Sequence, residues 1–195
     1  MRRVVVTGLG TINPLGKNVE DSWDSLIRSK CGIDKISTFD VNEYPCQIAG
    51  AIKPQHISED IVSSREQRKI DRFIILGLIA AHEAFLDSGF EVNEENSLRS
   101  GVMVGSGIGG LDTIYKNSSI LDNQGIRKIS PFFIPSSLIN LLSGHISIKF
   151  NLKGPNSSPV TACATGTHAI GDSFTLIKND KADLMVCGGA EAAIC

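Results

Sequence analysis

The stretch Gly154-Pro-Asn-Ser-Ser-Pro-Val-Thr-Ala-Cys-Ala-Thr-Gly-Thr-His-Ala-Ile-Gly171 carries a cysteine, Cys163, from an apolar run into a segment rich in glycine and alanine. We expect a short strand over 159–162 and a helix over 163–178, which places Cys163 in the first turn of that helix. Free N–H groups and the positive end of a helix stabilise a thiolate and can also bind an oxyanion. Cys163 is therefore a candidate nucleophile, although a free cysteine is most often a small buried residue.

Strands and helices alternate outward from this stretch. The sequence predicts further strands over 3–7, 101–105 and 182–187, and helices over 18–28, 66–88, 111–121 and 135–150, with residues 30–64 as an irregular excursion. This alternation predicts an α/β protein with a mostly parallel central sheet and helices on both faces.

Composition places the chain among ordinary globular proteins. It has 195 residues, of which 42% are hydrophobic and 21% charged, enough for one sizeable core. A net charge of −2 gives no global electrostatic reason to bind nucleic acid or a membrane surface. No run reaches the roughly 18 to 20 apolar residues of a membrane helix, and the start lacks a signal-peptide core, so a cytoplasmic location is the default.

The cysteines favour neither a disulfide framework nor a metal site. Their number is odd and they contain no C-x-x-C motif; they are Cys31, Cys46, Cys163, Cys187 and Cys195. Apart from Cys163, we expect each of them to have an inert structural role.

Several further motifs stand in the same order as in one known family. They are Val5-Val-Thr-Gly-Leu-Gly-Thr-Ile-Asn-Pro-Leu-Gly16, Lys69-Ile-Asp-Arg-Phe73, Gly105-Ser-Gly-Ile-Gly-Gly110, Pro131-Phe-Phe-Ile-Pro135, Ser143-Gly-His-Ile-Ser147, Val160-Thr-Ala-Cys-Ala-Thr-Gly-Thr-His168 and Asp183-Leu-Met-Val-Cys-Gly-Gly-Ala-Glu191. Together they resemble the elongating type II β-ketoacyl-(acyl carrier protein) synthases of the thiolase-like superfamily. The resemblance implies that residues 1–195 form the amino-terminal one of two similar halves, and that the carboxy-terminal half is absent.

The resemblance also implies an activity. In the family, the cysteine that matches Cys163 accepts an acyl chain from acyl carrier protein and supplies one N–H of the oxyanion hole. Decarboxylation of malonyl-(acyl carrier protein) then drives a condensation that needs no metal and no organic cofactor. Two histidines assist, and in the family they lie in H-G-T and G-H motifs of the carboxy-terminal half. This chain has no H-G-T, and its Gly144-His145 belongs to the amino-terminal motif Ser143-Gly-His-Ile-Ser147, so we expect the fragment to be inactive alone.

The four histidines of the chain match neither motif and are not assigned to catalysis. They are His56, His82, His145 and His168. We expect hydrogen-bonded structural roles for His82 and His145, which lie in predicted helices, whereas His168 stays open.

Further residues are assigned by the same resemblance. Ile108 and Phe133 match positions that contact the acyl chain, although an isoleucine after a strand is commonly plain core. The basic residues matching the carrier-protein docking surface are Arg65, Arg68, Lys69, Arg127 and Lys128. An ordinary solvated face is the simpler interpretation of such a cluster. The family further implies a homodimer, in which the strand before Cys163 lies near its equivalent in the partner.

Four alternatives compete with this interpretation. Gly105-x-Gly107-x-x-Gly110 fits a dinucleotide-binding fingerprint, but the acidic residue expected at the end of a second strand is missing, since Asp122 follows a predicted helix. A non-catalytic chain-length factor is disfavoured by the presence of Cys163. A thiolase and a polyketide-type ketosynthase share the fold and a cysteine.

Overall fold

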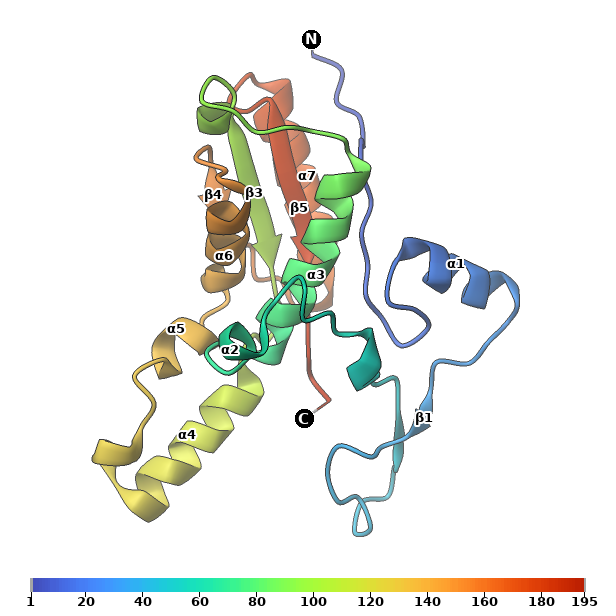
Figure 1. Cartoon of the computed structure of the whole chain (residues 1–195), viewed down its shortest axis with the longest axis vertical. Helices are drawn as coiled ribbons and strands as arrows, with labels where there is room; N and C mark the ends of the chain where they lie inside the picture. Colours follow the sequence, from blue (N-terminus) through green and yellow to red (C-terminus); the bar gives the residue numbers. More distant parts are fainter. Residues whose placement is uncertain (1, 195) are drawn as a thin grey trace.

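The computed structural model describes residues 2–194 and has a three-stranded parallel sheet at its centre (Figure 1). Strand β3 (Ser100–Gly105) lies between β4 (Asn156–Ser157) and β5 (Leu184–Gly189). Every residue of β3 is buried, as is typical of a strand with neighbours on both edges and helices on both faces. This confirms the α/β class predicted from the sequence.

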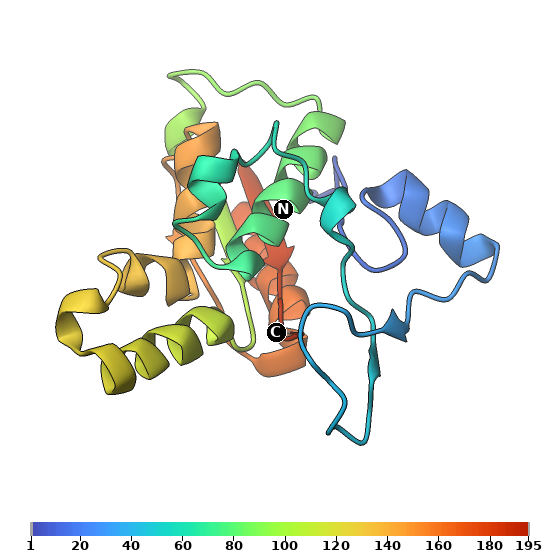
Figure 2. The same ribbon diagram turned by 60° about the horizontal axis from the view of Figure 1, so that its bottom comes forward.

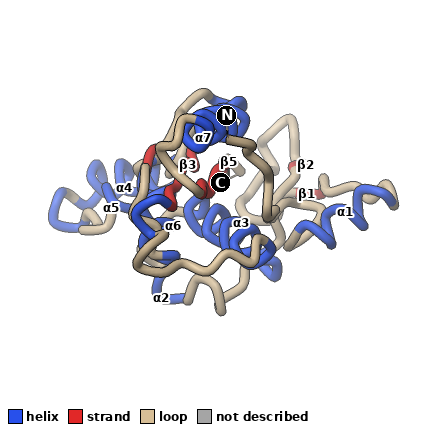
Figure 3. The backbone as a smooth tube through the Cα atoms, turned by 90° about the horizontal axis from the view of Figure 1, so that it is seen from above, coloured by secondary structure: helices blue, strands red, loops and turns tan. Residues whose placement is uncertain are grey.

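Helices cover both faces of the sheet, as Figure 3 shows in a view from above. Helix α7 (Thr165–Lys178) lies on one face, and α3 (Arg72–Asp87) and α6 (Asn140–Phe150) lie on the other. The fold therefore has three layers, with the sheet in the middle.

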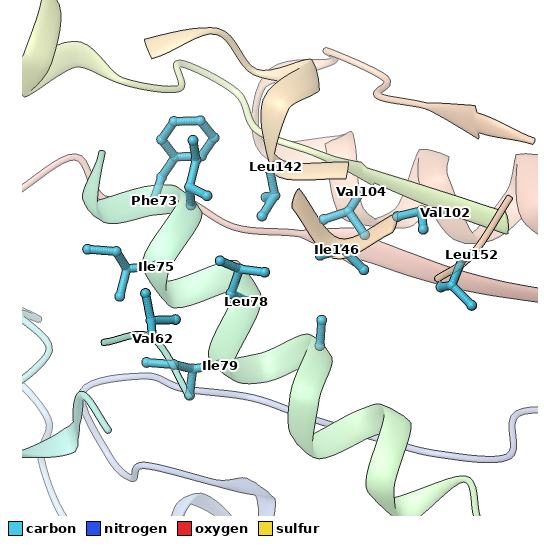
Figure 4. Packing of buried hydrophobic residues seen from close by; sticks show 12 residues of the cluster. Val62, Phe73, Ile75, Leu78, Ile79, Val102, Val104, Leu142, Ile146 and Leu152 are labelled. Carbon is cyan, nitrogen blue, oxygen red and sulfur yellow. The ribbon is translucent and has the colours of Figure 1, made fainter. Parts of the chain in front are cut away.

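The main core fills the space between α3, α6 and β3 (Figure 4). Its fully buried side chains include Phe73, Ile74, Val102, Leu142, Ile146 and Leu152. Burial of each large apolar side chain contributes roughly 1.5–3 kcal/mol relative to leaving it in water. Helix α3 is apolar on almost every side because it packs against the sheet, α6 and the loop around Val62 at once.

The predicted helix over 66–88 is in fact two helices. A short helix, α2 (Ser64–Gln67), is closed at its start by a capping box between Ser63 and Glu66. Asp71 then caps α3 by accepting the N–H of Phe73, and its backbone is extended. The prediction was wrong at this point because Asp71 starts a new helix. Gly89 follows the end of α3 with φ +62°, in agreement with its predicted role as the residue that stops this helix.

The remaining helices differ from the prediction mainly in their ends. Helix α1 (Val19–Ile27) starts at its predicted cap, Asn18, which accepts the N–H of Asp21. Helix α4 (Leu111–Gln124) is one turn longer than expected. The predicted helix 135–150 is divided into α5 (Phe133–Ser137) and α6, because Leu138 adopts an extended conformation.

The amino-terminal segment 3–7 is not a strand, which corrects the prediction of a buried strand there. Val5 and Val6 are 58% and 77% exposed. A cleft of about 430 Å³ separates the segment from β5. Within the described residues the segment pairs with no strand, and the outer edge of β5 stays free, so its valines do not become core.

The residues that follow the segment, 8–11, are bound to α3. The N–H groups of Leu9 and Thr11 donate to the carboxylates of Asp87 and Glu83, both at 2.9 Å. A Cβ on Gly8 would lie 2.1 Å from a carbonyl oxygen of α3, so only glycine permits this approach.

The sheet register also corrects two strand boundaries. Val102 pairs with Asn156 of β4 and with Val186 of β5. The predicted strand 159–162 does not form, because Pro159 lacks an N–H and the Ser158 hydroxyl donates to the Val104 carbonyl instead. The last strand lies two residues later than predicted.

Residues 30–64 have little regular structure. They contain an antiparallel pair, β1 (Asp34–Lys35) and β2 (Ile48–Ala49), and the 3₁₀ turn η1 (Pro54–His56). This stretch and the α4–α5 arm project on opposite sides of the molecule (Figure 2). Three more 3₁₀ turns are η2 (Ser97–Arg99), η3 (Ile126–Lys128) and η4 (Ala162–Ala164).

No helix within residues 2–194 is both long and apolar enough to cross a membrane.

Candidate functional site

The candidate site lies at the carboxyl edge of the parallel sheet. Three segments meet there: 105–107 after β3, 162–166 at the start of α7, and 189–191 after β5. Together they line a cavity of about 210 Å³ that includes Cys163. The carboxyl edge of parallel strands is where α/β proteins commonly bind their ligands.

Cys163 lies just before the predicted helix and not in its first turn, because α7 begins at Thr165. It lies in η4, directly before α7, and its side chain is exposed to solvent. The sulfur is therefore reachable from the cavity and is not sealed in the core. Free N–H groups at the start of α7 lie in the same turn.

The turn before Cys163 is held in an uncommon conformation. Ala162 has φ +51°, a value that costs a residue with a side chain about 1 kcal/mol or more. Buried Thr165 holds this conformation, since its hydroxyl donates to the Ala162 carbonyl at 2.8 Å and accepts the Thr161 N–H at 2.9 Å. The turn 161–165, which carries Cys163, is therefore held at both ends by the hydrogen bonds of Thr165.

Glycines allow the three segments to come together. A Cβ on Gly105 would lie 2.0 Å from the Pro159 carbonyl oxygen, which no side chain tolerates. A Cβ on Gly107 or on Gly189 would lie 3.2 Å from backbone atoms of the segment 162–166. The cavity is therefore walled largely by backbone, which leaves room for a substrate carbonyl group.

The glycine turn 105–110 is fixed by two side chains. The Ser106 hydroxyl accepts the Gly109 N–H at 3.1 Å, and the Glu191 carboxylate accepts the Ile108 N–H at 2.8 Å. The Ile108 side chain is 51% exposed and is not among the residues that line the cavity. Sequence reasoning gave Glu191 no role of its own, and its only signal was the stretch Gly188-Gly-Ala-Glu191, whose glycines end β5.

The same contact weakens the dinucleotide interpretation. A phosphate at this turn would need the backbone N–H groups that a helix start presents. The Glu191 carboxylate already occupies the Ile108 N–H and places a negative charge where an anion would bind.

His168 lies about one helical turn beyond Cys163. Its Nδ1 is 3.3 Å from the Thr161 hydroxyl, and its Nε2 is 3.0 Å from the Asp172 carboxylate. The ring thus links α7 to the turn that carries Cys163.

The other helical histidines are packed away from the cavity. His82 stacks on Phe150, and burial lowers its pKa. Burial also lowers the pKa of His145. We expected His82 to have a hydrogen-bonded role, and for one ring nitrogen this prediction is wrong. His82 Nδ1 is buried with no hydrogen-bond partner among the described residues. Its ring is held by packing instead.

The basic residues form two separate groups. Arg65 lies in α2, and Arg68 and Lys69 follow it directly. The Lys69 ammonium lies 5.2 Å from the centre of the Phe132 ring. Arg127 and Lys128 lie in η3, at the far end of α4 (Figure 1). The five basic residues are therefore carried by two different elements of the fold, α2 with the residues after it and η3.

Phe133 starts α5 and is likewise absent from the cavity wall. Among residues 2–194 no group of three or more histidine, cysteine, aspartate or glutamate side chains could hold a metal ion. The four described cysteines are free thiols, and burial raises the pKa of Cys187. Cys195 lies outside the described residues.

This geometry defines a class: an α/β protein that presents an exposed cysteine at a helix start, on the carboxyl edge of a parallel sheet. The family model "Beta-ketoacyl synthase, N-terminal domain" matches residues 1–195. The chain belongs to this family.

Curated relatives agree with the family model. The chain is 47% identical over 192 residues to 3-oxoacyl-[acyl-carrier-protein] synthase 2 of Coxiella burnetii, 46% identical over 192 residues to that of Vibrio cholerae and 41% identical over 193 residues to that of Staphylococcus aureus. These matches cover 98–99% of this chain and 46% of each relative. The chain therefore spans about half the length of the curated relatives it matches.

Solved structures share the fold. A type II PKS ketosynthase in complex with its acyl-carrier protein has a TM-score of 0.75 and 26% identity, covering 98% of this chain and 51% of that one. A β-ketoacyl synthase from Burkholderia phymatum has a TM-score of 0.80 and 24% identity, covering 95% of this chain and 46% of that one. The thiolase-like fold predicted from the motifs is thereby confirmed.

Proposed function

We propose that this chain is the nucleophile-bearing half of a β-ketoacyl-(acyl carrier protein) synthase that elongates fatty acids. The observation that carries the proposal is Cys163, exposed in a tied turn at the start of α7 and facing a backbone-walled cavity. A thiolate at a helix start is stabilised by the N–H groups of the first turn, and this suits acyl transfer.

The reaction proceeds in two steps. The Cys163 thiolate attacks the thioester carbonyl of acyl-(acyl carrier protein), and the carrier thiol leaves with a proton. Malonyl-(acyl carrier protein) then loses carbon dioxide, and the resulting carbanion attacks the acyl carbon. A carbon–carbon bond forms, the Cys163 thiolate leaves, and the product is a β-ketoacyl thioester on the carrier. The two histidines that the family uses in the second step have no counterpart in this chain, so the complete reaction belongs to a longer protein.

Fatty-acid elongation is preferred to polyketide synthesis because of the relatives. The synthases that are 41–47% identical to this chain over the aligned residues are named 3-oxoacyl-[acyl-carrier-protein] synthase 2, whereas the type II PKS ketosynthase is 26% identical. The proposal includes a cytoplasmic location and requires no metal or organic cofactor.

The proposed partners are acyl carrier protein and a second copy of the chain. The group Arg65, Arg68 and Lys69 on and after α2, and the pair Arg127 and Lys128 in η3, offer positive charge to an acidic carrier, mainly to speed its encounter. The homodimer is supported by β4, an edge strand of the described sheet whose residues are exposed. Ile108 and Phe133 are proposed to contact the acyl chain in this assembly.

Acylation tests the proposal directly. The protein at its full natural length is incubated with hexadecanoyl-(acyl carrier protein), digested, and mapped by mass spectrometry. We expect one acyl group on Cys163 and none in the Cys163→Ala variant. Cys31→Ala and Cys46→Ala are matched controls, because both residues are exposed free cysteines outside the cavity, and both variants should acylate like the unmodified protein. Acylation of Cys31 or Cys46 with none on Cys163 would reject the proposal.

A further inference from the structure

The glycine turn 105–110 lies beside the nucleophile. Ile108 has a glycine on either side, and Gly109 has φ +77°. Glycine leaves the backbone free to adopt many conformations, so the path of this turn depends on contacts from outside it. Backbone hydrogen bonds hold the two ends of the turn, from the Ala190 N–H to the Gly105 carbonyl and from the Gly110 N–H to the Ser137 carbonyl. Between these ends, one side-chain contact is local, from Ser106 to the Gly109 N–H.

The second contact comes from a distant part of the chain. Glu191 follows the end of β5, and one of its carboxylate oxygens accepts the Ile108 N–H at 2.8 Å across 83 residues of sequence. A hydrogen bond to a carboxylate is charge-assisted and stronger than one between neutral groups. Its other oxygen contacts the neighbouring Ala192 N–H at 3.3 Å.

Ion pairing does not account for the position of the Glu191 carboxylate. No salt bridge within residues 2–194 includes Glu191, and both of its hydrogen-bond partners are backbone N–H groups. Glu191 also lines the Cys163 cavity. Its contact therefore fixes the backbone that presents Ile108 relative to the nucleophile.

We infer that Glu191 is a positioning residue that sets acyl-chain selectivity by holding the backbone of Ile108 beside the Cys163 cavity. The inference rests on the proposed function, because it needs an acyl group on Cys163 and Ile108 in contact with it. Glu191 acts through Ile108 and takes no part in bond making. Without its acceptor, the glycine turn samples several positions and the isoleucine no longer discriminates between chains of different length.

The test is a selectivity ratio measured on the protein at its full natural length. Rates of Cys163 acylation are compared for hexadecanoyl and hexanoyl thioesters of acyl carrier protein, in the unmodified protein and in variants at position 191. We expect Glu191→Ala to change the ratio about tenfold, the size expected for a lost charge-assisted hydrogen bond. Glu191→Gln keeps an oxygen that can accept the same N–H, so its ratio should stay within about twofold of the unmodified protein.

A double-mutant cycle separates positioning from general damage to the fold. With Ile108→Ala the selecting side chain is gone, so adding Glu191→Ala should change the ratio by less than about twofold. Glu94→Ala is the matched control, an exposed carboxylate outside the cavity, and should leave the ratio unchanged. If Glu191→Ala does not fold, Glu191→Asp replaces it, because its shorter side chain does not reach the Ile108 N–H.

Two results would overturn the inference. One is an unchanged ratio in Glu191→Ala, and the other is an equal change in the presence and absence of the Ile108 side chain. Failure of the proposed function is a different result, since the unmodified protein would then carry no acyl group on Cys163 with either thioester.

Discussion

Two stretches of the chain have almost the same sequence pattern and different structures. Val4-Val-Val-Thr-Gly8 and Val102-Met-Val-Gly105 are both apolar runs that end in glycine. The second forms the central strand of the sheet and is buried throughout. The first is extended but unpaired, and Val6 is 77% exposed.

The difference shows that a strand depends on its neighbours more than on its own residues. Strand β3 has β4 on one edge and β5 on the other, so its N–H and C=O groups are paired and its side chains are covered. The segment 4–8 faces a cleft of about 430 Å³ where a neighbour would be. Each glycine lets the backbone come close to another segment: Gly8 lies against α3, and Gly105 lies against the carbonyl of Pro159.

The largest expected effect is at Gly105. A Cβ there would lie 2.0 Å from the Pro159 carbonyl oxygen and 2.6 Å from the Thr165 side chain, so Gly105→Ala must displace the turn that carries Cys163. We expect a loss of at least about 3 kcal/mol in the free energy of unfolding, measured by denaturant titration.

Gly144→Ala is the matched control for this substitution. Gly144 lies in α6 with nothing within 4 Å of its added Cβ. Alanine should stabilise the helix there by about 0.5–1 kcal/mol. Equal effects at the two glycines would show that close approach is not what Gly105 provides.

An intermediate effect is expected from shortening one valine in each stretch. Val102 is 0% exposed, and Val102→Ala should cost about 2 kcal/mol through lost burial and the cavity it leaves. Val6→Ala should change the stability by no more than about 0.5 kcal/mol. Thermal or denaturant unfolding measures both, and a comparable loss at Val6 would mean that segment 4–8 is buried in solution.

The smallest effect concerns the ion pairs that link the amino terminus to the start of β5. Arg99 and Arg2 hold the pKa of Asp183 at about 2, mainly through hydrogen bonds. Because the folded-state pKa is lowered from 3.8, the stabilisation by Asp183 is present above pH 3.8 and is lost as the pH falls toward 2. The groups are partly exposed, so solvent screening keeps the contribution small.

Melting temperatures between pH 2 and pH 5 provide the measurement. The unmodified protein should lose stability more steeply in this range than Asp183→Asn, which has no carboxylate to protonate at this position. Identical acid profiles for the two proteins would show that the ion pairs do not hold the amino-terminal segment to β5.

Much of the site could be predicted from local sequence. Cys163 was placed at a helix start because an apolar run precedes it and small residues follow it, and the structure puts it directly before α7. The cap at Asn18 and the stop at Gly89 were also predictable, since each acts within a few residues. The break at Asp71 was missed, because the apolar periodicity continues from Ile70 into α3 and conceals the new cap.

Other features had no local signal. The contact between Glu191 and the Ile108 N–H joins residues 83 positions apart. The binding of segment 9–11 to Glu83 and Asp87 spans more than 70 positions. Periodicity cannot report which distant group will accept a given N–H, so neither contact was predicted.

The sequence by itself determined the family, the α/β class and the presentation of Cys163 at the start of a helix, because motifs, caps and apolar periodicity act over short stretches of chain. Only the tertiary structure decided that one valine run is a central strand and the other forms no strand, and that Glu191 accepts the Ile108 N–H of the glycine turn. The physical reason is that a backbone N–H can pair with whichever acceptor the fold brings within reach, and the fold of the whole chain makes that choice.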